Sequence, residues 1–269
     1  MKTRMITAFV LILVFGSILV IGEGSLSFLF SGGVILLAMM AAYEFMIKLH
    51  RHGLDKYWFH YLPIAFTFVF VLLNVLFFEH TQYHRMMYLY LLALSLTYFM
   101  IYLVDQRMTR QELGVSMIAI LYASIGFTAL AYLRSISLEI ILYLLLVTIL
   151  TDTFAYFFGI KFGKHKLLPK VSPKKSVEGA LAGLLFGGTL GTLFASILNI
   201  FDFHLVFIII LSLGLSMVSQ SGDLIASKFK REQGIKDYSN IFPGHGGVLD
   251  RFDSTMFAAA FLMMILQVI

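Results

Sequence analysis

The segment from residue 219 to 253 concentrates the side chains whose types and spacing could do chemistry. It reads SQSGDLIASKFKREQGIKDYSNIFPGHGGVLDRFD and interrupts a chain that mostly alternates long apolar runs with short polar turns. The run PGHGG at 243–247 is incompatible with a regular spanning helix, because proline and clustered glycines punctuate helices. The five cations of the segment are Lys228, Lys230, Arg231, Lys236 and Arg251, and its five carboxylates are Asp223, Glu232, Asp237, Asp250 and Asp253. This mixture predicts a functional site at a membrane surface.

Three of these carboxylates have the placement of metal ligands. Asp223 lies near the end of one apolar run, and Asp250 and Asp253 begin the next at i, i+3 spacing, which puts both on one helix face. Carboxylates from adjoining helix ends suit Mg²⁺, which takes its other oxygen ligands from water and substrate phosphates. The alternative is helix capping, since Asp favours N-caps and first turns. Capping accounts for Asp250 or Asp253 alone but not for their combination with Asp223 and His245, so we expect a metal site.

The lysines and arginines indicate phosphate binding. Lys170, Lys174 and Lys175 precede the apolar run that starts at residue 179, and a second basic group occupies residues 228–236. Cations beside prolines, glycines and acids in turns favour phosphate clamping at helix N-termini. The alternative is contact with anionic lipid headgroups, and it is strongest for three lysines: Lys161, Lys164 and Lys166. No GxxxxGK[ST] sequence occurs, so a nucleotide would be held by metal, Lys/Arg and loop backbone.

Three other ionisable residues have a functional and a structural interpretation. Asp152 lies within an apolar run, where charge is costly, so we expect a function; the alternative is an ion pair with an interfacial lysine such as Lys161. His245 lies between glycines and could act as an acid, a base or a phosphate hydrogen-bond donor, or as a structural turn residue. Glu44 and Lys48 are spaced as an ordinary helix pair, and a role for Glu44 at the cytosolic boundary stays open.

The elements that position these residues must lie in lipid. Hydrophobic residues make up 59% of the 269-residue chain and charged residues 13%, whereas about a quarter of residues in soluble proteins are charged. A spanning helix needs about 20 mostly apolar residues, so we predict an all-α, polytopic integral membrane protein with about nine transmembrane helices. The predicted spans are 5–22, 26–47, 57–78, 85–104, 113–133, 138–159, 179–201, 204–226 and 250–269.

The distribution of Lys and Arg predicts the topology. With the N-terminus in the cytosol and the C-terminus outside, 18 of the 20 Lys and Arg residues face the cytosol, as the positive-inside rule requires. The two longest connections, 160–178 and 227–249, are both basic and both cytosolic, and loops of that length are usually functional. We therefore predict an N-terminal transmembrane scaffold (1–135, helices one to five) and a C-terminal catalytic transmembrane region (136–269, helices six to nine).

A glycine stripe marks the seventh predicted helix. Gly179, Gly183, Gly187 and Gly191 recur every four residues, which lets a neighbouring backbone approach one face closely. The stripe has two interpretations, tight packing within the chain and a dimer interface. A homodimer therefore stays open.

Residues 227–253, SKFKREQGIKDYSNIFPGHGGVLDRFD, resemble without a break the signature of phosphatidate cytidylyltransferases (CDP-diacylglycerol synthases). Three upstream blocks resemble further motifs of that family: DTFAYFFG at 152–159, SPKKSVEG at 172–179 and QSGDL at 220–224. One departure is Ser176, where the family commonly has Thr; both residues carry a hydroxyl. The resemblance covers about residues 150–255, and the first 140 residues match only in hydropathy.

The resemblance implies transfer of CMP from CTP to phosphatidic acid, giving CDP-diacylglycerol and pyrophosphate in phospholipid biosynthesis at the cytosolic face of a prokaryotic-type plasma (inner) membrane. It implies Mg²⁺, and the number of ions stays open: one Mg²⁺, two divalent ions, or one divalent and one monovalent ion. We expect Asp223 and Asp250 to hold the metal. CTP, phosphatidic acid and the bilayer are the expected partners, and no nucleic acid is expected. The catalytic residues would be Asp223, Asp250, Lys230, Arg231, His245 and Arg251. The substrate-binding residues would be Asp152, Ser172, Lys174, Lys175, Ser176, Lys236, Asp237, Gly246, Gly247 and Asp253.

Two other functions fit the same residues. A CTP-dependent lipid kinase acting on polyprenol or phytol would share the apolar scaffold and a related basic and acidic site. A transporter of anions or lipid phosphates would line a pathway with these charges. The clustering of charges at one surface and the lack of an internal repeat disfavour the transporter.

Overall fold

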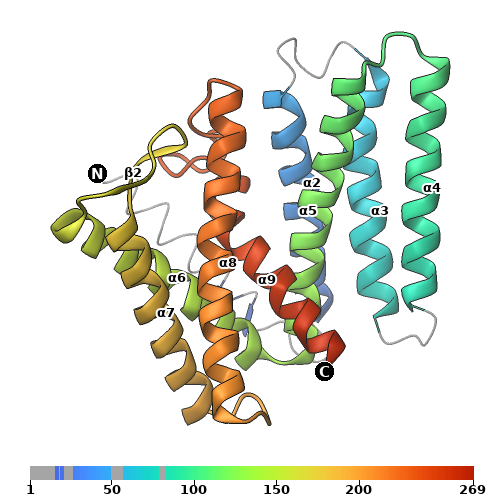
Figure 1. Cartoon of the computed structure of the whole chain (residues 1–269). Coiled ribbons are helices and arrows are strands. Elements are labelled where there is room, and N and C mark those ends of the chain that lie inside the picture. The colour runs from blue at the N-terminus through green and yellow to red at the C-terminus, as the bar shows by residue number, and fades with distance from the viewer. Residues whose placement is uncertain (1–15, 18, 21–26, 50–56, 79–82) are drawn as a thin grey trace. The chain divides into compact units, whose positions relative to one another are not determined.

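The computed structural model describes residues 16–17, 19–20, 27–49, 57–78 and 83–269 of the chain (Figure 1). Eight helical segments in that part of the chain are long and apolar enough to cross a membrane, which agrees with the predicted all-α, polytopic class. The elements are α2 (Ser27–Leu49), the short 3₁₀ helix η3 (Trp58–Tyr61), α3 (Leu62–Phe77), α4 (Tyr83–Val104), α5 (Arg110–Ile136), α6 (Leu138–Phe162), β1 (Lys166–Leu168), β2 (Ser172–Ser176), α7 (Val177–Ile197), α8 (Leu205–Glu232) and α9 (Leu249–Val268).

The observed helices follow the predicted spans closely, with informative differences at the ends. The first predicted span, 5–22, lies almost wholly outside the described residues. Helix α8 continues to Glu232, six residues beyond the predicted end at 226. Its last turn carries Lys230 and Arg231, and cations at this end interact favourably with the helix dipole. The charges therefore mark helix that extends past the apolar run, and the predicted orientation of the termini stays a prediction.

The predicted 160–178 loop is largely ordered. Helix α6 runs to Phe162, and β1 and β2 then form an antiparallel hairpin in which Lys166 pairs with Ser176 and Leu168 with Ser172. The sequence PKVSPKK reads as a turn because of its prolines and lysines, yet both residue types are common on strands with an exposed edge. Within the part of the chain that the structure describes, the helices are thus accompanied by a small two-stranded sheet.

The chain forms two compact units. Unit 1 comprises residues 1–132 and 238–248, and unit 2 comprises residues 133–237 and 249–269. Part of the core of unit 1 is a buried cluster from η3, α4, α5 and the turn before α5: Phe59, Leu94, Tyr98, Met108 and Ile120. The predicted roles of 1–135 and 136–269 stay predictions, but packing groups the 238–248 segment with the N-terminal helices.

Unit 2 is built around close contact between α6 and α7, with α8 and α9 packed beside them (Figure 1). The glycine stripe of α7 faces α6 of the same chain: Gly179 lies against Ala155, Gly183 and Gly187 against Thr151, and Gly191 against Val147. The Thr151 and Ser216 hydroxyls are 2.7 Å apart, and Ser216 Oγ also donates to the Gly183 carbonyl at 3.3 Å. The stripe therefore packs helices within the chain.

This contact predicts opposite effects for two glycine-to-alanine changes. A Cβ at position 183 would lie 2.6 Å from the Thr151 carbonyl oxygen, whereas a Cβ at Gly114 of α5 meets nothing within 4 Å. We expect Gly183→Ala to lower the thermal unfolding midpoint in detergent. Gly114→Ala should keep or raise it, because alanine favours a helix over glycine by about 0.5–1 kcal/mol. Equal midpoints for the two variants would contradict the close α6–α7 contact.

Candidate active site

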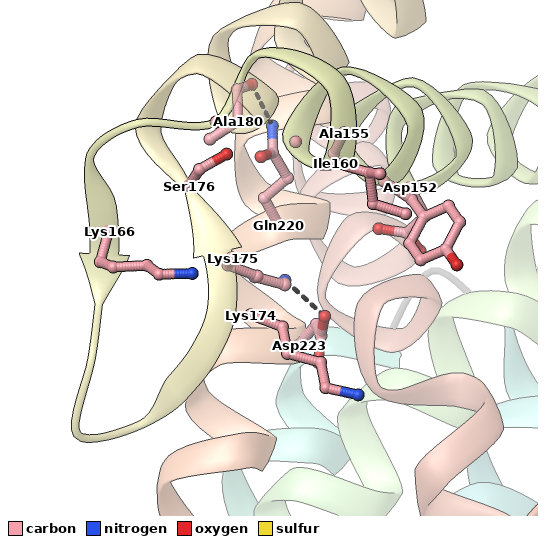
Figure 2. A pocket seen from close by; sticks show the side chains of 13 residues that line it. Asp152, Ala155, Ile160, Lys166, Lys174, Lys175, Ser176, Ala180, Gln220 and Asp223 are labelled. Carbon is pink, nitrogen blue, oxygen red and sulfur yellow. Dashed lines mark hydrogen bonds and ion pairs between the residues drawn. The ribbon is translucent and has the colours of Figure 1, made fainter.

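A cavity of about 670 Å³ opens in unit 2 among α6, the hairpin, α7 and α8 (Figure 2). Five residues predicted for the site from the sequence line it: Asp152, Lys174, Lys175, Ser176 and Asp223. Lys166 of β1 adds a third lysine, and Tyr156 and Ile160 of α6 contribute apolar surface. The cavity therefore combines cations, carboxylates and an apolar wall in a volume typical of small-molecule sites.

Asp223 of α8 forms an ion pair with Lys175 of β2, and the two side chains point toward each other in the cavity (Figure 2). Their side chains are 28% and 27% exposed, so both remain accessible to a ligand. Asp223 also accepts a hydrogen bond from Ser227 Oγ at 3.3 Å, one helical turn further along α8. The pair links the hairpin to α8 and leaves Lys175 open to an anionic substrate.

A second ion pair joins Lys230, near the end of α8, to Asp250, at the start of α9, with 2.8 Å between Nζ and Oδ1. It is buried, with the two side chains 10% and 3% exposed. Two charges can be buried only if each compensates the other, because a lone charge in a low-dielectric interior is costly. Both residues were predicted for the site from the sequence, but their pairing with each other was not predicted.

Negative charge gathers where α6, α8 and α9 meet. Asp152 accepts a hydrogen bond from Ser254 Oγ at 3.4 Å, and Asp253 accepts one from the Ser254 amide at 2.8 Å. Asp223 lies within electrostatic reach of both Asp152 and Asp253. Lys175 and Lys230 offset part of this negative charge, and a bound cation would offset more of it.

These carboxylates suit Mg²⁺ by their chemistry, since it takes hard oxygen ligands. Within the described ranges, no group of three or more His, Cys, Asp or Glu side chains is arranged to hold a metal ion. A Mg²⁺ ion held by two protein carboxylates and completed by water and substrate phosphates fits this arrangement, because Mg²⁺ usually keeps several such ligands.

The remaining predicted residues of unit 2 differ in their contacts and exposure. Arg231 Nε donates to the Val171 carbonyl in the hairpin turn at 3.3 Å, and its Nη1 donates to the Ile235 carbonyl at 3.1 Å. Ser176 Oγ accepts from the Gly179 amide at 3.2 Å and thereby caps α7. The other predicted residues are the half-buried Ser172, which begins β2, and the exposed Lys236, Asp237 and Arg251.

His245, Gly246 and Gly247 belong to the 238–248 segment of unit 1. This segment is a tight turn in which the Phe242 amide donates to the Gly246 carbonyl at 2.9 Å and the His245 amide to the Phe242 carbonyl at 2.8 Å. Gly246 has φ 84°, a conformation that glycine adopts readily and other residues rarely do. His245 Nδ1 is buried and has no hydrogen-bond partner among the described residues, so its imidazole is not committed to holding the turn at that atom.

Sequence reasoning missed two residues that contact predicted ones. Ser254 contacts Asp152, and its only sequence signal is its position next to Asp253. Glu44 was interpreted mainly as the partner of Lys48, whose side chain lies outside the described residues. In the structure Glu44 is buried and accepts hydrogen bonds from the 238–248 segment. The sequence did contain a signal for Glu44, because an ionisable residue inside an apolar span is costly and usually has a structural or functional partner.

Comparison with known proteins gives one consistent result. The family model for the cytidylyltransferase family matches residues 2–269. A Staphylococcus saprophyticus phosphatidate cytidylyltransferase is 36% identical over 272 residues, covering 99% of each chain. A Staphylococcus haemolyticus phosphatidate cytidylyltransferase is 34% identical over 276 residues, also covering 99% of each chain. A Staphylococcus aureus protein of the same name is 42% identical over 162 residues, which is 60% of this chain and 61% of that one.

The buried ion pair predicts a large stability effect at one lysine and a small one at its neighbour. Lys230→Met leaves Asp250 buried without its cation, and we expect a loss of about 3–5 kcal/mol in unfolding free energy. Lys228→Met removes only an exposed pair with Glu232 at 3.9 Å and should change stability little. Denaturant unfolding in detergent measures both. A double variant, Lys230→Met with Asp250→Leu, should recover much of the loss, and no recovery would contradict the pairing.

Proposed function

This chain belongs to the cytidylyltransferase family, and we propose that it transfers CMP from CTP to phosphatidic acid, giving CDP-diacylglycerol and pyrophosphate. The observation that carries the proposal is the cavity of unit 2, where three lysines and two carboxylates line one space beside apolar side chains of α6. Both substrates are polyanions, and one of them is a lipid. A basic cavity with an apolar wall suits a reaction between them.

The chemistry requires little of the protein beyond positioning and charge neutralisation. A phosphatidate oxygen attacks the α-phosphorus of CTP and forms a new P–O bond. The bond from that phosphorus to the oxygen bridging to the β-phosphate breaks, and pyrophosphate leaves with the electron pair. The nucleophile is already ionised, so no strong general base is needed. Lys174 and Lys175, on the hairpin at the cavity, would offset the phosphate charge as it shifts to the leaving group.

Asp223 and Asp250 would hold Mg²⁺ in this proposal. When bound, Mg²⁺ neutralises phosphate oxygens and orients the reacting groups. In the structure each carboxylate is paired with a lysine, so a bound Mg²⁺ would have to displace or share that lysine. Lys230, Arg231 and Arg251 would add to phosphate binding, and Lys236, Asp237 and His245 would shape the nucleotide site, as the family motifs imply.

The site would face the cytosol of a bacterial-type plasma membrane. The excess of Lys and Arg in the predicted inside segments supports this orientation. A homodimer is not part of the proposal, because the glycine stripe that suggested one packs against α6.

Replacing Asp223 tests the role of the carboxylates. Asp223 is partly exposed, so Asp223→Asn should fold, whereas Asp250→Asn would leave Lys230 without its buried counter-ion. We expect Asp223→Asn to reduce CDP-diacylglycerol formation by about 100-fold or more, the scale of losing one electrostatic contact to a transition state. Asp202→Asn, an exposed change on the turn before α8, is the matched control. Near-normal activity of Asp223→Asn would refute its role.

The products distinguish the proposed reaction from lipid phosphorylation. Purified protein in detergent, given labelled CTP, phosphatidic acid and Mg²⁺, should release pyrophosphate and form CDP-diacylglycerol, and chelation of divalent ions should stop both. Release of CDP with a polyprenol or phytol acceptor would identify a kinase. Turnover in detergent, where no compartments exist, would also exclude a function limited to transport.

A further inference from the structure

We propose that Glu44 is a positioning residue for CMP transfer, holding the 238–248 loop in its working conformation; this inference rests on the proposed function. Glu44 lies on α2, far in sequence from every family motif, and is 2% exposed. Its Oε1 accepts a hydrogen bond from Ser239 Oγ at 2.5 Å and another from the Val248 amide at 2.9 Å. One carboxylate oxygen therefore binds both ends of the loop.

The residues beside these two bonds shape the same contact. Phe45, next to Glu44, stacks on Tyr238 at the start of the loop, with ring centroids 6.1 Å apart and an interplanar angle of 23°. A Cβ on Gly247 would lie 2.6 Å from the carboxyl carbon of Glu44. A side chain at position 247 would therefore displace the Glu44 carboxylate from its place against the loop. The 238–248 loop, which lies within a family motif, is thus held by Glu44 on α2, a helix outside those motifs.

A positioning role explains why this partner is a carboxylate. A buried charge is costly, and two neutral acceptors could have satisfied Ser239 and Val248. Charge-assisted hydrogen bonds are shorter and about twice as strong as neutral ones, so Glu44 closes the loop more firmly. The loop carries His245, Gly246 and Gly247, and the chain leaves it directly into α9. Fixing the loop would pre-organise these residues before CTP binds.

Steady-state kinetics of Glu44 and Ser239 variants test the role. We expect Glu44→Ala to lower kcat/KM for CTP by about 10–100-fold, the scale of one charged hydrogen bond. The KM for phosphatidic acid should change little. Glu44→Gln, which keeps a carbonyl acceptor, should recover part of the activity. Ser239→Ala should cause a smaller loss in the wild-type background and no further loss in Glu44→Ala, because both act through the same loop.

A spin label gives a readout that does not depend on activity. The chain has no cysteine, so Ile241→Cys introduces a single labelling site in the loop, at a residue that is 41% exposed. We expect a restrained nitroxide spectrum with Glu44 present and a mobile one in Glu44→Ala. A label at Leu168→Cys in the hairpin of unit 2, a residue 44% exposed, should give the same spectrum in both backgrounds.

The outcomes separate this inference from the proposed function. Wild-type protein that makes no CDP-diacylglycerol would overturn the function, while the labels would still show whether Glu44 holds the loop. Active wild type with an unchanged Ile241 label and a kcat/KM within about twofold in Glu44→Ala would overturn the inference alone. Two other results would also overturn the inference. If Glu44→Ala changed the spectra of both labels, or lowered kcat/KM equally for CTP and for phosphatidic acid, Glu44 would have a general role in stability.

Discussion

The arrangement of unit 2 depends on compensating carboxylates with lysines. Asp223 binds Lys175, and Asp250 binds Lys230. The first pair connects the hairpin to α8, and the second connects α8 to α9. Because charges removed from water need partners, each pair restricts how its two elements can pack. The first pair also holds Lys175 at the cavity of unit 2, where the proposed reaction would bring a polyanionic substrate.

The walls of the cavity in unit 2 depend on the close approach of α6 and α7. Glycines on α7 let it lie against the backbone of α6, and Gln220 of α8 donates to the Ala180 carbonyl of α7 at 3.3 Å (Figure 2). These contacts leave Asp152 of α6 and Asp223 of α8 on the walls of one cavity. Larger residues on the stripe would meet the backbone and side chains of α6, so the close contact between α6 and α7 would be lost.

Local sequence patterns predicted most of the helices and much of the candidate site. The features that they did not predict depend on contacts between residues far apart in the sequence. Apolar length alone located the described spans, since a helix in lipid must satisfy its own backbone. Composition could not show that the lysines of 172–176 form a strand, because the pairing partner lies across a turn. Nor could spacing link Glu44 to Val248, 204 residues away. Helical periodicity pointed to Lys48 instead, which shows that a local pair can mask a distant partner.

Residues 238–248 pack with unit 1 although they are translated much later, and this has a consequence for synthesis and membrane insertion of the protein. Glu44 enters the membrane long before Val248 is translated, and the two are 204 residues apart. At about 5–20 residues per second, the ribosome needs about 10–40 s to make the missing partner. During that interval, unit 1 holds a carboxylate in an apolar helix without its final ligands. Completion of unit 1 therefore waits for a segment made about 200 residues later, and insertion must tolerate a first unit whose packing is still incomplete.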